Sequence, residues 1–305
     1  MTVYDISMFF DENDLYELKL NQHWDFVDKF IVIEAGQAHT GYKKPFNFDH
    51  KRFEKYKSKL IYVNFASIEE EIKRNPDLLD NFTTHDRSSE GKHTLDWIRS
   101  DFHGNYSVKV LTALGAADED IILNNSLDEL ITKEAFEQAL LVFEDKTKLY
   151  QLNSNDVMLL REDGMPYMTR PTLGFVLDHY IYKYNLWSQK CDVGQITEFS
   201  FFKEILPSTA RSLSMNTHKS IGPNSGWHFS WMDDTDGERV LKKQKSWGHS
   251  RDILPDQKVK FLHESKEEAL KRLFLDYETK KIDITPETHP KYLIDNLDKY
   301  KNYIL

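Results

Sequence analysis

The feature that most constrains the fold is a set of short apolar runs separated by a helical segment near the start of the chain. Residues 3–10 form an apolar, β-prone run, and the acidic residues 11–14 supply capping groups for a helix predicted through about residue 25. Two further apolar runs, at 30–34 and 60–63, have the length of buried strands. Strand, helix and strand at this spacing form a βαβ unit, which predicts an α/β fold with a mostly parallel central sheet flanked by helices.

The rest of the chain continues the alternation of helical and strand-like segments. Strands are predicted at 120–125, 194–202 and 224–231, and the aromatic-rich segment 170–187 fits either a strand or a helix. Helices are predicted at 96–115, 132–141, 266–277 and in a last segment that places Leu293, Leu297, Tyr300 and Ile304 on one face. Ser265 and Glu268 form a capping box at the start of the 266–277 helix. No repeat or linker interrupts the sequence, so a single domain of residues 1–305 is expected.

Charge and cysteine content limit the classes of function. The formal net charge is -10, whereas a general nucleic-acid binder is more often basic, so no nucleic-acid partner is expected. Cys191 is the single cysteine, which excludes an internal disulfide and a cysteine-rich zinc site and fits a reducing compartment. The acidic start is unlike a signal peptide, and no apolar run approaches the roughly 18 residues of a membrane span. A cytoplasmic protein without membrane insertion is therefore predicted.

The first constellation that could carry chemistry is the segment 124–129, which follows the predicted strand at 120–125. Ligands of open α/β sheets sit at the carboxyl ends of the strands. Asp128 and Glu129 there could hold Mg²⁺ or Mn²⁺ against a diphosphate, because these hard ions prefer oxygen ligands. The alternative is a helix N-cap, since both residues precede a predicted helix.

The second constellation is the glycine-tryptophan-histidine segment 226–231. His228 could bind a metal or a phosphate, and strand alternation places Trp227 and Phe229 on the face opposite to it. The alternative is a buried histidine that is hydrogen-bonded to backbone.

The third constellation is basic. Lys243 and His249 lie in the segment 243–249 and could neutralise a diphosphate leaving group. Arg211 and Lys44 are isolated basic residues with a similar potential role. The alternative for all of them is a solvated surface.

Taken together and in order, these segments resemble glycosyltransferase family 17. The similar blocks are FFDENDLYELKL at 9–20, VDKFIVIE at 27–34, TGYKKP at 40–45, DIILNNSLDEL at 120–130, SGWHFSW at 225–231, the spacing of Lys243, Ser246 and His249, and KYLIDNL at 291–297. The family's acidic motif reads Asp-x-Asp-Glu, and Ser126 stands here in place of its first Asp. The family usually also has a Gln-Arg pair upstream of this motif, and the corresponding stretch of this sequence is near Gly104 and Asn105.

The resemblance implies a GT-A-like, Rossmann-like fold and an inverting transfer of a sugar from a UDP-sugar to a glycan hydroxyl. N-acetylglucosamine is the sugar that animal members of the family transfer. It implies a nucleotide-binding half at 1–150, an acceptor half at 151–305, and Mn²⁺ or Mg²⁺ held by Asp128 and His228. The donor-binding candidates are Glu34, Lys44, Ser126, Arg211, Trp227, Lys243 and His249, and the candidates for the catalytic carboxylates are Asp128, Glu129, Asp233 and Asp234.

Two other readings stay open. The change at Ser126 also fits a catalytically impaired homologue that binds carbohydrate, while a nucleotidyltransferase is disfavoured by the lack of a glycine-rich phosphate loop. For an enzyme, the expected acceptor is a glycan built inside a microbial or virus-infected cell.

Overall fold

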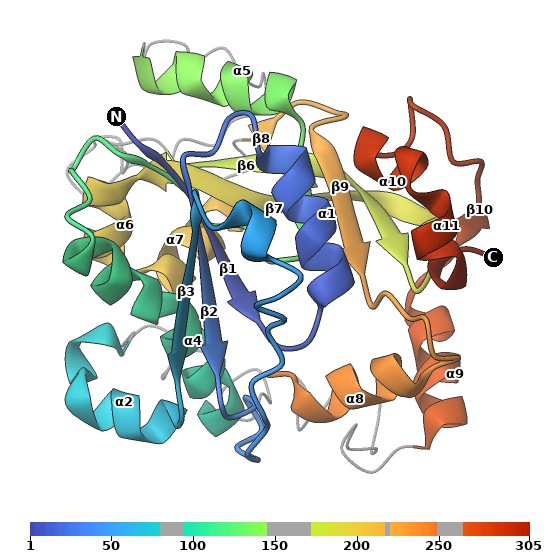
Figure 1. The fold of residues 1–305 in the computed structure, drawn as a ribbon, viewed down its shortest axis with the longest axis horizontal. Coiled ribbons are helices and arrows are strands. Elements are labelled where there is room, and N and C mark those ends of the chain that lie inside the picture. Colours follow the sequence, from blue (N-terminus) through green and yellow to red (C-terminus); the bar gives the residue numbers. More distant parts are fainter. Residues whose placement is uncertain (80–93, 145–171, 217–219, 249–264) are drawn as a thin grey trace.

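The predicted βαβ start is present in the computed structural model, which describes residues 1–79, 94–144, 172–216, 220–248 and 265–305. Strand β1 (Val3–Phe9) leads into helix α1 (Asn13–His23), and β2 (Lys29–Ala35) pairs with β1 in parallel. Strand β3 (Leu60–Phe65) continues the parallel arrangement beside β2 (Figure 1). Strands β1 and β2 are apolar and almost fully buried, as expected for internal strands of a parallel sheet, whereas β3 is the edge strand and is mostly part-exposed.

The complete sheet is mixed, which corrects the prediction of a mostly parallel one. Its order is β3-β2-β1-β4-β7-β6-β9-β5, with β4 (Ile121–Leu123) parallel to β1. Strand β7 (Leu186–Glu198) runs antiparallel to both β4 and β6 (Thr172–Ile181). Strand β9 (Gly226–Ser230) is parallel to β6, and β5 (Glu129–Ile131) is antiparallel to β9. The short connection between β6 and β7 explains the change, since strands joined by a tight turn pair antiparallel.

Helices cover both faces of this sheet. Alternating side chains of β2 divide the core: Phe30 and Val32 pack with α1 and with α5 (Lys133–Glu144), whereas Ile31 and Ile33 pack with α2, α4 and α6. The bounds of these and the remaining helices are α2 (Ile68–Arg74), α4 (Thr94–Ala113), α6 (Phe199–Ile205), α7 (Pro207–Asn216), α8 (Glu238–Ser246), α9 (Lys266–Asp276), α10 (Lys291–Asp295) and α11 (Leu297–Tyr300). The short elements are β8 (Ser220–Ile221), β10 (Lys280–Lys281) and the 3-10 helices Glu54–Tyr56, Pro76–Leu78 and Lys301–Tyr303. Within the described ranges, no helix has the length and apolar character of a membrane span.

Several boundaries differ from the prediction. The segment from residue 172 is a strand, and the predicted strand at 194–202 ends at Glu198, where α6 begins. The predicted last helix is broken at Asn296, whose φ of -128° is not helical, so Leu297 is 38% exposed although Leu293 and Tyr300 are buried. The helix α9 and its capping box are confirmed.

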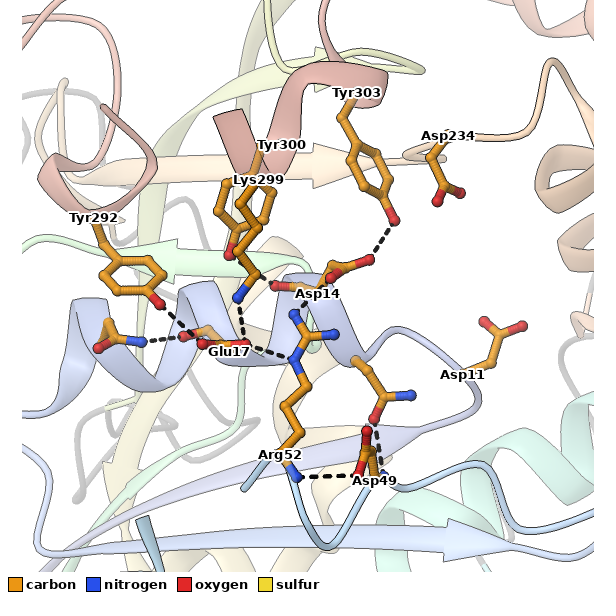
Figure 2. Close-up of polar contacts among 12 residues, drawn as sticks. Asp11, Asp14, Glu17, Asp49, Arg52, Asp234, Tyr292, Lys299, Tyr300 and Tyr303 are labelled. Carbon is orange, nitrogen blue, oxygen red and sulfur yellow. Dashed lines mark hydrogen bonds and ion pairs between the residues drawn. The ribbon is translucent and has the colours of Figure 1, made fainter. Parts of the chain in front are cut away.

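The C-terminal segment docks on α1 through the buried carboxylate of Glu17 (Figure 2). Glu17 accepts hydrogen bonds from Arg52 Nε at 2.5 Å, Lys299 Nζ at 2.6 Å and the Tyr292 hydroxyl at 2.9 Å. One turn earlier, Asp14 accepts from the Tyr303 hydroxyl at 2.8 Å. The first turns of α1 are thereby tied to the last residues of the chain.

Candidate active site

Three residues from the first, second and third constellations meet at one edge of the sheet. The carboxylate of Asp128 lies 3.3 Å from Lys243 Nζ and 3.7 Å from His228 Nε2. Asp128 immediately precedes β5, His228 lies within β9, and Lys243 lies on α8. Because β5 runs antiparallel to β9, the start of β5 lies at the edge where β1, β4 and β9 end. Asp128 therefore stands at the carboxyl edge of these strands, where α/β sheets bind ligands.

The local pairing of β5 with β9 explains why Asp128 and His228 are neighbours. Glu129 pairs directly with His228, and the Phe229 backbone N–H donates to the Asp128 carbonyl oxygen at 2.8 Å. Gly226 allows this approach, since its φ is +151° and a Cβ there would lie 2.0 Å from the Leu130 carbonyl oxygen. Asp128 does not cap a helix, so the alternative of a helix N-cap is wrong for this residue.

A buried network that sequence reasoning missed supports the turn before Asp128. Lys19 Nζ lies 2.9 Å from an Asp5 carboxylate oxygen and donates to the carbonyl oxygens of Asn125 at 3.1 Å and Ser126 at 3.2 Å. His23 Nδ1 lies 2.5 Å from Asp5, and its Nε2 accepts from the Ile131 N–H at 2.9 Å. The signal in the sequence was a lysine between Leu18 and Leu20 in α1.

Charge compensation dominates the electrostatics of the Asp128 cluster. Burial acts to raise the pKa of Asp128, but Lys243 and His228 outweigh it and hold the pKa well below its usual range. Burial alone lowers the pKa of His228, whereas the Asp128 carboxylate raises it to about 10. Burial likewise opposes the charge of Lys243, and Asp128 and Glu12 raise its pKa above the ordinary value. The cluster thus places two cations against one partly buried carboxylate.

A small cavity of about 30 Å³ lies beside Lys243, between the end of β1 and α8. It is lined by Phe10, Asp11, Glu12, Leu15, Phe229, Trp231, Met232, Arg239, Lys242, Lys243 and Tyr303. An open hollow of about 480 Å³ is lined by Tyr42, Glu238, Leu241, Lys242 and Lys245. Lys242 lines both, and the open hollow has the size of a small-molecule site.

Helix α8 presents a basic face to the cavity. Arg239, Lys242 and Lys243 follow the spacing at which helical side chains share one face. Arg239 lies 3.3 Å from Asp234 and 3.6 Å from Asp11, and it donates to the Tyr303 hydroxyl at 2.8 Å. Sequence reasoning found Lys243 but missed Arg239 and Lys242, which bring two further cations to the same side.

Asp233 and Asp234 have different surroundings. The buried Asp233 carboxylate accepts from the Thr235 N–H at 2.5 Å and from the Val240 N–H at 3.1 Å, so it fixes the first turn of α8. Burial opposes ionisation of Asp233, and these backbone donors lower its pKa. Asp234 is 27% exposed and meets solvent beside Arg239. Figure 2 shows Asp234 and Asp11 on the same side of Tyr303.

Glu129 and Arg211 form an internal ion pair. Arg211 Nη1 donates to one Glu129 carboxylate oxygen at 3.0 Å, and Nη2 donates to the other. The Ser126 N–H also donates to Glu129, at 2.9 Å. Glu129 is 1% exposed, so this carboxylate is held away from solvent by its partners.

Glu34 and Lys44 form a second internal pair, at 2.7 Å. The buried Glu34 carboxylate also accepts from the backbone N–H groups of Asn47 and Phe48 and from the Tyr62 hydroxyl. The pair fastens the segment after β2 to the sheet, and contact of either side chain with a donor would require this arrangement to open.

Trp227 and Phe229 lie on the face of β9 opposite to His228, as strand alternation predicts. The Trp227 indole N–H donates to the Thr288 carbonyl oxygen at 2.8 Å, and Phe229 is fully buried against Tyr180. Trp227 therefore lies away from the Asp128 cluster. His249 lies outside the described residues.

Comparison with known proteins gives one family match. The model of glycosyltransferase family 17 matches residues 1–137, which include Asp128 and the β4–β5 turn. A search of curated proteins found no match. The resemblance drawn from the ordered motifs is confirmed by this match.

Proposed function

From the match to glycosyltransferase family 17, which supports a glycosyltransferase, we propose that the Asp128 cluster is the site of sugar transfer from a nucleotide donor. The observation that carries this proposal is the convergence of Asp128, His228 and Lys243 beside the basic face of α8. The donor is a UDP-sugar, with N-acetylglucosamine as the first sugar to test, and the acceptor is a glycan hydroxyl. The fold proposed for this enzyme is GT-A-like.

The basic face supplies the chemistry that a departing diphosphate needs. Arg239, Lys242 and Lys243 place cationic groups at the cavity before any ligand arrives. Fixed charges of this kind stabilise developing negative charge without having to reorganise during the reaction. The open hollow that shares Lys242 has room for the remainder of the donor.

A divalent cation, Mn²⁺ or Mg²⁺, fits this site through Asp128. Mg²⁺ is usually held by one or two carboxylates together with substrate phosphates and water. Asp128 is 15% exposed and makes no bidentate arginine pair, in contrast to Glu129, so its oxygens remain accessible to an ion. His228 is the second candidate ligand. A bound ion would neutralise the charge that develops on the leaving diphosphate.

Asp234 is the carboxylate that best fits the general base of an inverting transfer. It is more exposed than Asp233 and Glu129, and it lies beside the Arg239 side chain that lines the cavity. A general base must reach the acceptor hydroxyl, and an exposed carboxylate at the rim of the donor site can do so. The enzyme is proposed to act in the cytoplasm of a microbial or virus-infected cell.

A carbohydrate-binding homologue without catalysis is the second candidate. Two observations favour it: Ser126 stands where the resemblance places an Asp, and Glu129 is occupied by Arg211. Such a protein would bind sugar but would not need a nucleotide or a cation.

In the proposed division into a nucleotide-binding half at 1–150 and an acceptor half at 151–305, both halves contribute to the Asp128 cluster. Asp128 lies in the first half and Lys243 in the second.

The test is donor hydrolysis and transfer with UDP-sugars, with and without Mn²⁺, together with thermal shifts induced by UDP. Wild type is expected to turn over at least one UDP-sugar, and Asp128→Asn is expected to lose that activity. Glu137→Gln is the matched control, because Glu137 is 60% exposed on α5 and forms its ion pair there with Lys133. Sugar binding without turnover and without a UDP-induced shift would favour the second candidate instead.

A further inference from the structure

A row of potential ligand side chains crosses one face of the sheet next to Asp128. His228 on β9 pairs with His179 on β6, and Cys191 lies on the next strand, β7. In the β6–β7 pairing, Leu177 is opposite Cys191 and His179 is two residues further along the same face. The register therefore places His228, His179 and Cys191 on one side of three adjacent strands.

Their donor atoms are close enough to share an ion. One ring nitrogen each from His179 and His228 and the Cys191 sulfur all lie within 4.8 Å of one another. His228 Nδ1 lies 3.6 Å from Cys191 Sγ. In a tetrahedral zinc site, a nitrogen at about 2.05 Å and a sulfur at about 2.3 Å from the ion lie about 3.6 Å from each other. The His228 and Cys191 atoms thus already have the spacing of two zinc ligands.

His179 lacks hydrogen-bond partners although it is buried. It is 4% exposed, and neither ring nitrogen makes a hydrogen bond to any residue that the structure describes. Its ring stacks on that of His228, with centroids 4.5 Å apart and planes at 14°, and the Tyr277 ring meets it edge-on. A buried polar group without a partner destabilises the fold, so an imidazole in this place favours a bound ligand.

We propose that His179, Cys191 and His228 form a site for a zinc-class divalent cation. Two imidazoles and a thiolate suit zinc and its borderline neighbours, whereas Mg²⁺ and Mn²⁺ prefer oxygen donors. Three protein ligands leave a fourth position for water or an added ligand. The site contains one cysteine, so the exclusion of a cysteine-rich zinc site still holds.

Asp128 takes a supporting place in this arrangement. With His228 Nδ1 directed at the ion, its Nε2 faces the Asp128 carboxylate at 3.7 Å. Histidine ligands are commonly oriented by a carboxylate on their second nitrogen. With His228 bound to the zinc-class ion, the cation that accompanies the sugar donor would rest on Asp128 and would no longer have His228 as its second ligand. The proposal depends on the side-chain geometry alone and not on the reaction.

The test is zinc and cobalt binding to the full chain without any nucleotide or sugar, under a reductant that keeps the thiol free. Wild type is expected to bind one zinc ion per chain. With cobalt it should show a thiolate-to-metal charge-transfer band, which can come only from Cys191 because the chain has no other cysteine. Cys191→Ser should abolish the band, and His179→Ala should weaken zinc binding by more than 10-fold.

His50→Ala is the matched control, since His50 is an exposed histidine on a separate part of the chain, and it should change neither result. Asp128→Asn should keep the band and weaken binding by about 10–100-fold, the range for a supporting partner of a metal ligand. Absence of the band in wild type, or equal zinc affinity in wild type and Cys191→Ser with both proteins folded by circular dichroism, overturns the proposal. Turnover of UDP-sugars is measured in a separate assay, so a failure of the sugar-transfer proposal does not affect the zinc and cobalt binding results.

Discussion

Replacing Glu17 with glutamine tests how strongly the C-terminal segment is held to α1. The Glu17 carboxylate is 5% exposed and contacts Arg52, Lys299 and Tyr292 (Figure 2). Burial acts against its charge, but these hydrogen bonds and the charge of Arg52 outweigh burial and lower its pKa from 4.5 to about 2. At about 1.36 kcal/mol per pKa unit, the charged form stabilises the folded state by about 3 kcal/mol.

The sign of the pH dependence follows from the lowered pKa. The stabilisation is fully present above the unfolded-state pKa of 4.5 and is lost as the pH falls from there toward about 2. We therefore expect Glu17→Gln to lower the free energy of unfolding by about 2–3 kcal/mol at pH 7, because the amide keeps part of the hydrogen bonding. The deficit should shrink steadily between pH 5 and the lowest pH at which the chain stays folded.

Urea unfolding followed by tryptophan fluorescence at several pH values measures this difference. Glu54→Gln is the control, since Glu54 is 66% exposed and pairs with the exposed Lys57 on its own turn, so its loss should cost less than about 1 kcal/mol. The reasoning is refuted if Glu17→Gln costs no more than Glu54→Gln at pH 7. It is also refuted if the deficit of Glu17→Gln stays constant as the pH falls through 4.

Three further substitutions probe the frame of the candidate site. Lys19→Met should lower the free energy of unfolding by about 3–5 kcal/mol, because it removes the lysine partner of the buried Asp5 carboxylate, and UDP binding should weaken with it. Denaturation and titration measure the two effects. Arg211→Met should lower the free energy of unfolding by a similar amount, because it removes the arginine partner of the buried Glu129 carboxylate. The double variant Arg211→Met/Glu129→Leu should recover much of that loss, which a double-mutant cycle measures. Gly226→Ala should prevent normal pairing of β5 with β9, so we expect little folded protein by soluble expression and circular dichroism. Gly115→Ala is the control, because there is open space where the Cβ of residue 115 would lie.

The sequence predicts the main members of the Asp128 cluster because each sits at a recognisable local place. Asp128 follows a buried apolar strand, and His228 follows a glycine at the start of another strand. Their distance apart depends on the pairing of β5 with β9, which local patterns do not show. For the same reason the mixed order of the sheet was missed, since the partner of a strand is set by long-range packing.

The surroundings of other residues could not be predicted, because an acid at a strand end has the same sequence signature whether it faces a ligand or a neighbouring loop. Glu34 turned out to hold the segment that contains Lys44. Lys19 escaped notice because lysines are mostly exposed, whereas this one lies on a helix whose residues 15–20 are all buried. His179 and Cys191 are near each other only through the register of β6, β7 and β9.

The pairing of distant strands means that the segment matched by the family model cannot carry the site by itself. A polypeptide cut after residue 137 would keep Asp128 but would leave β4 without β7 and β5 without β9. It would also lack both cations that compensate the Asp128 charge, and two bare strand edges would be open to self-association. During synthesis, Lys243 therefore reaches Asp128 only after α8 has emerged, more than a hundred residues after the carboxylate that it neutralises.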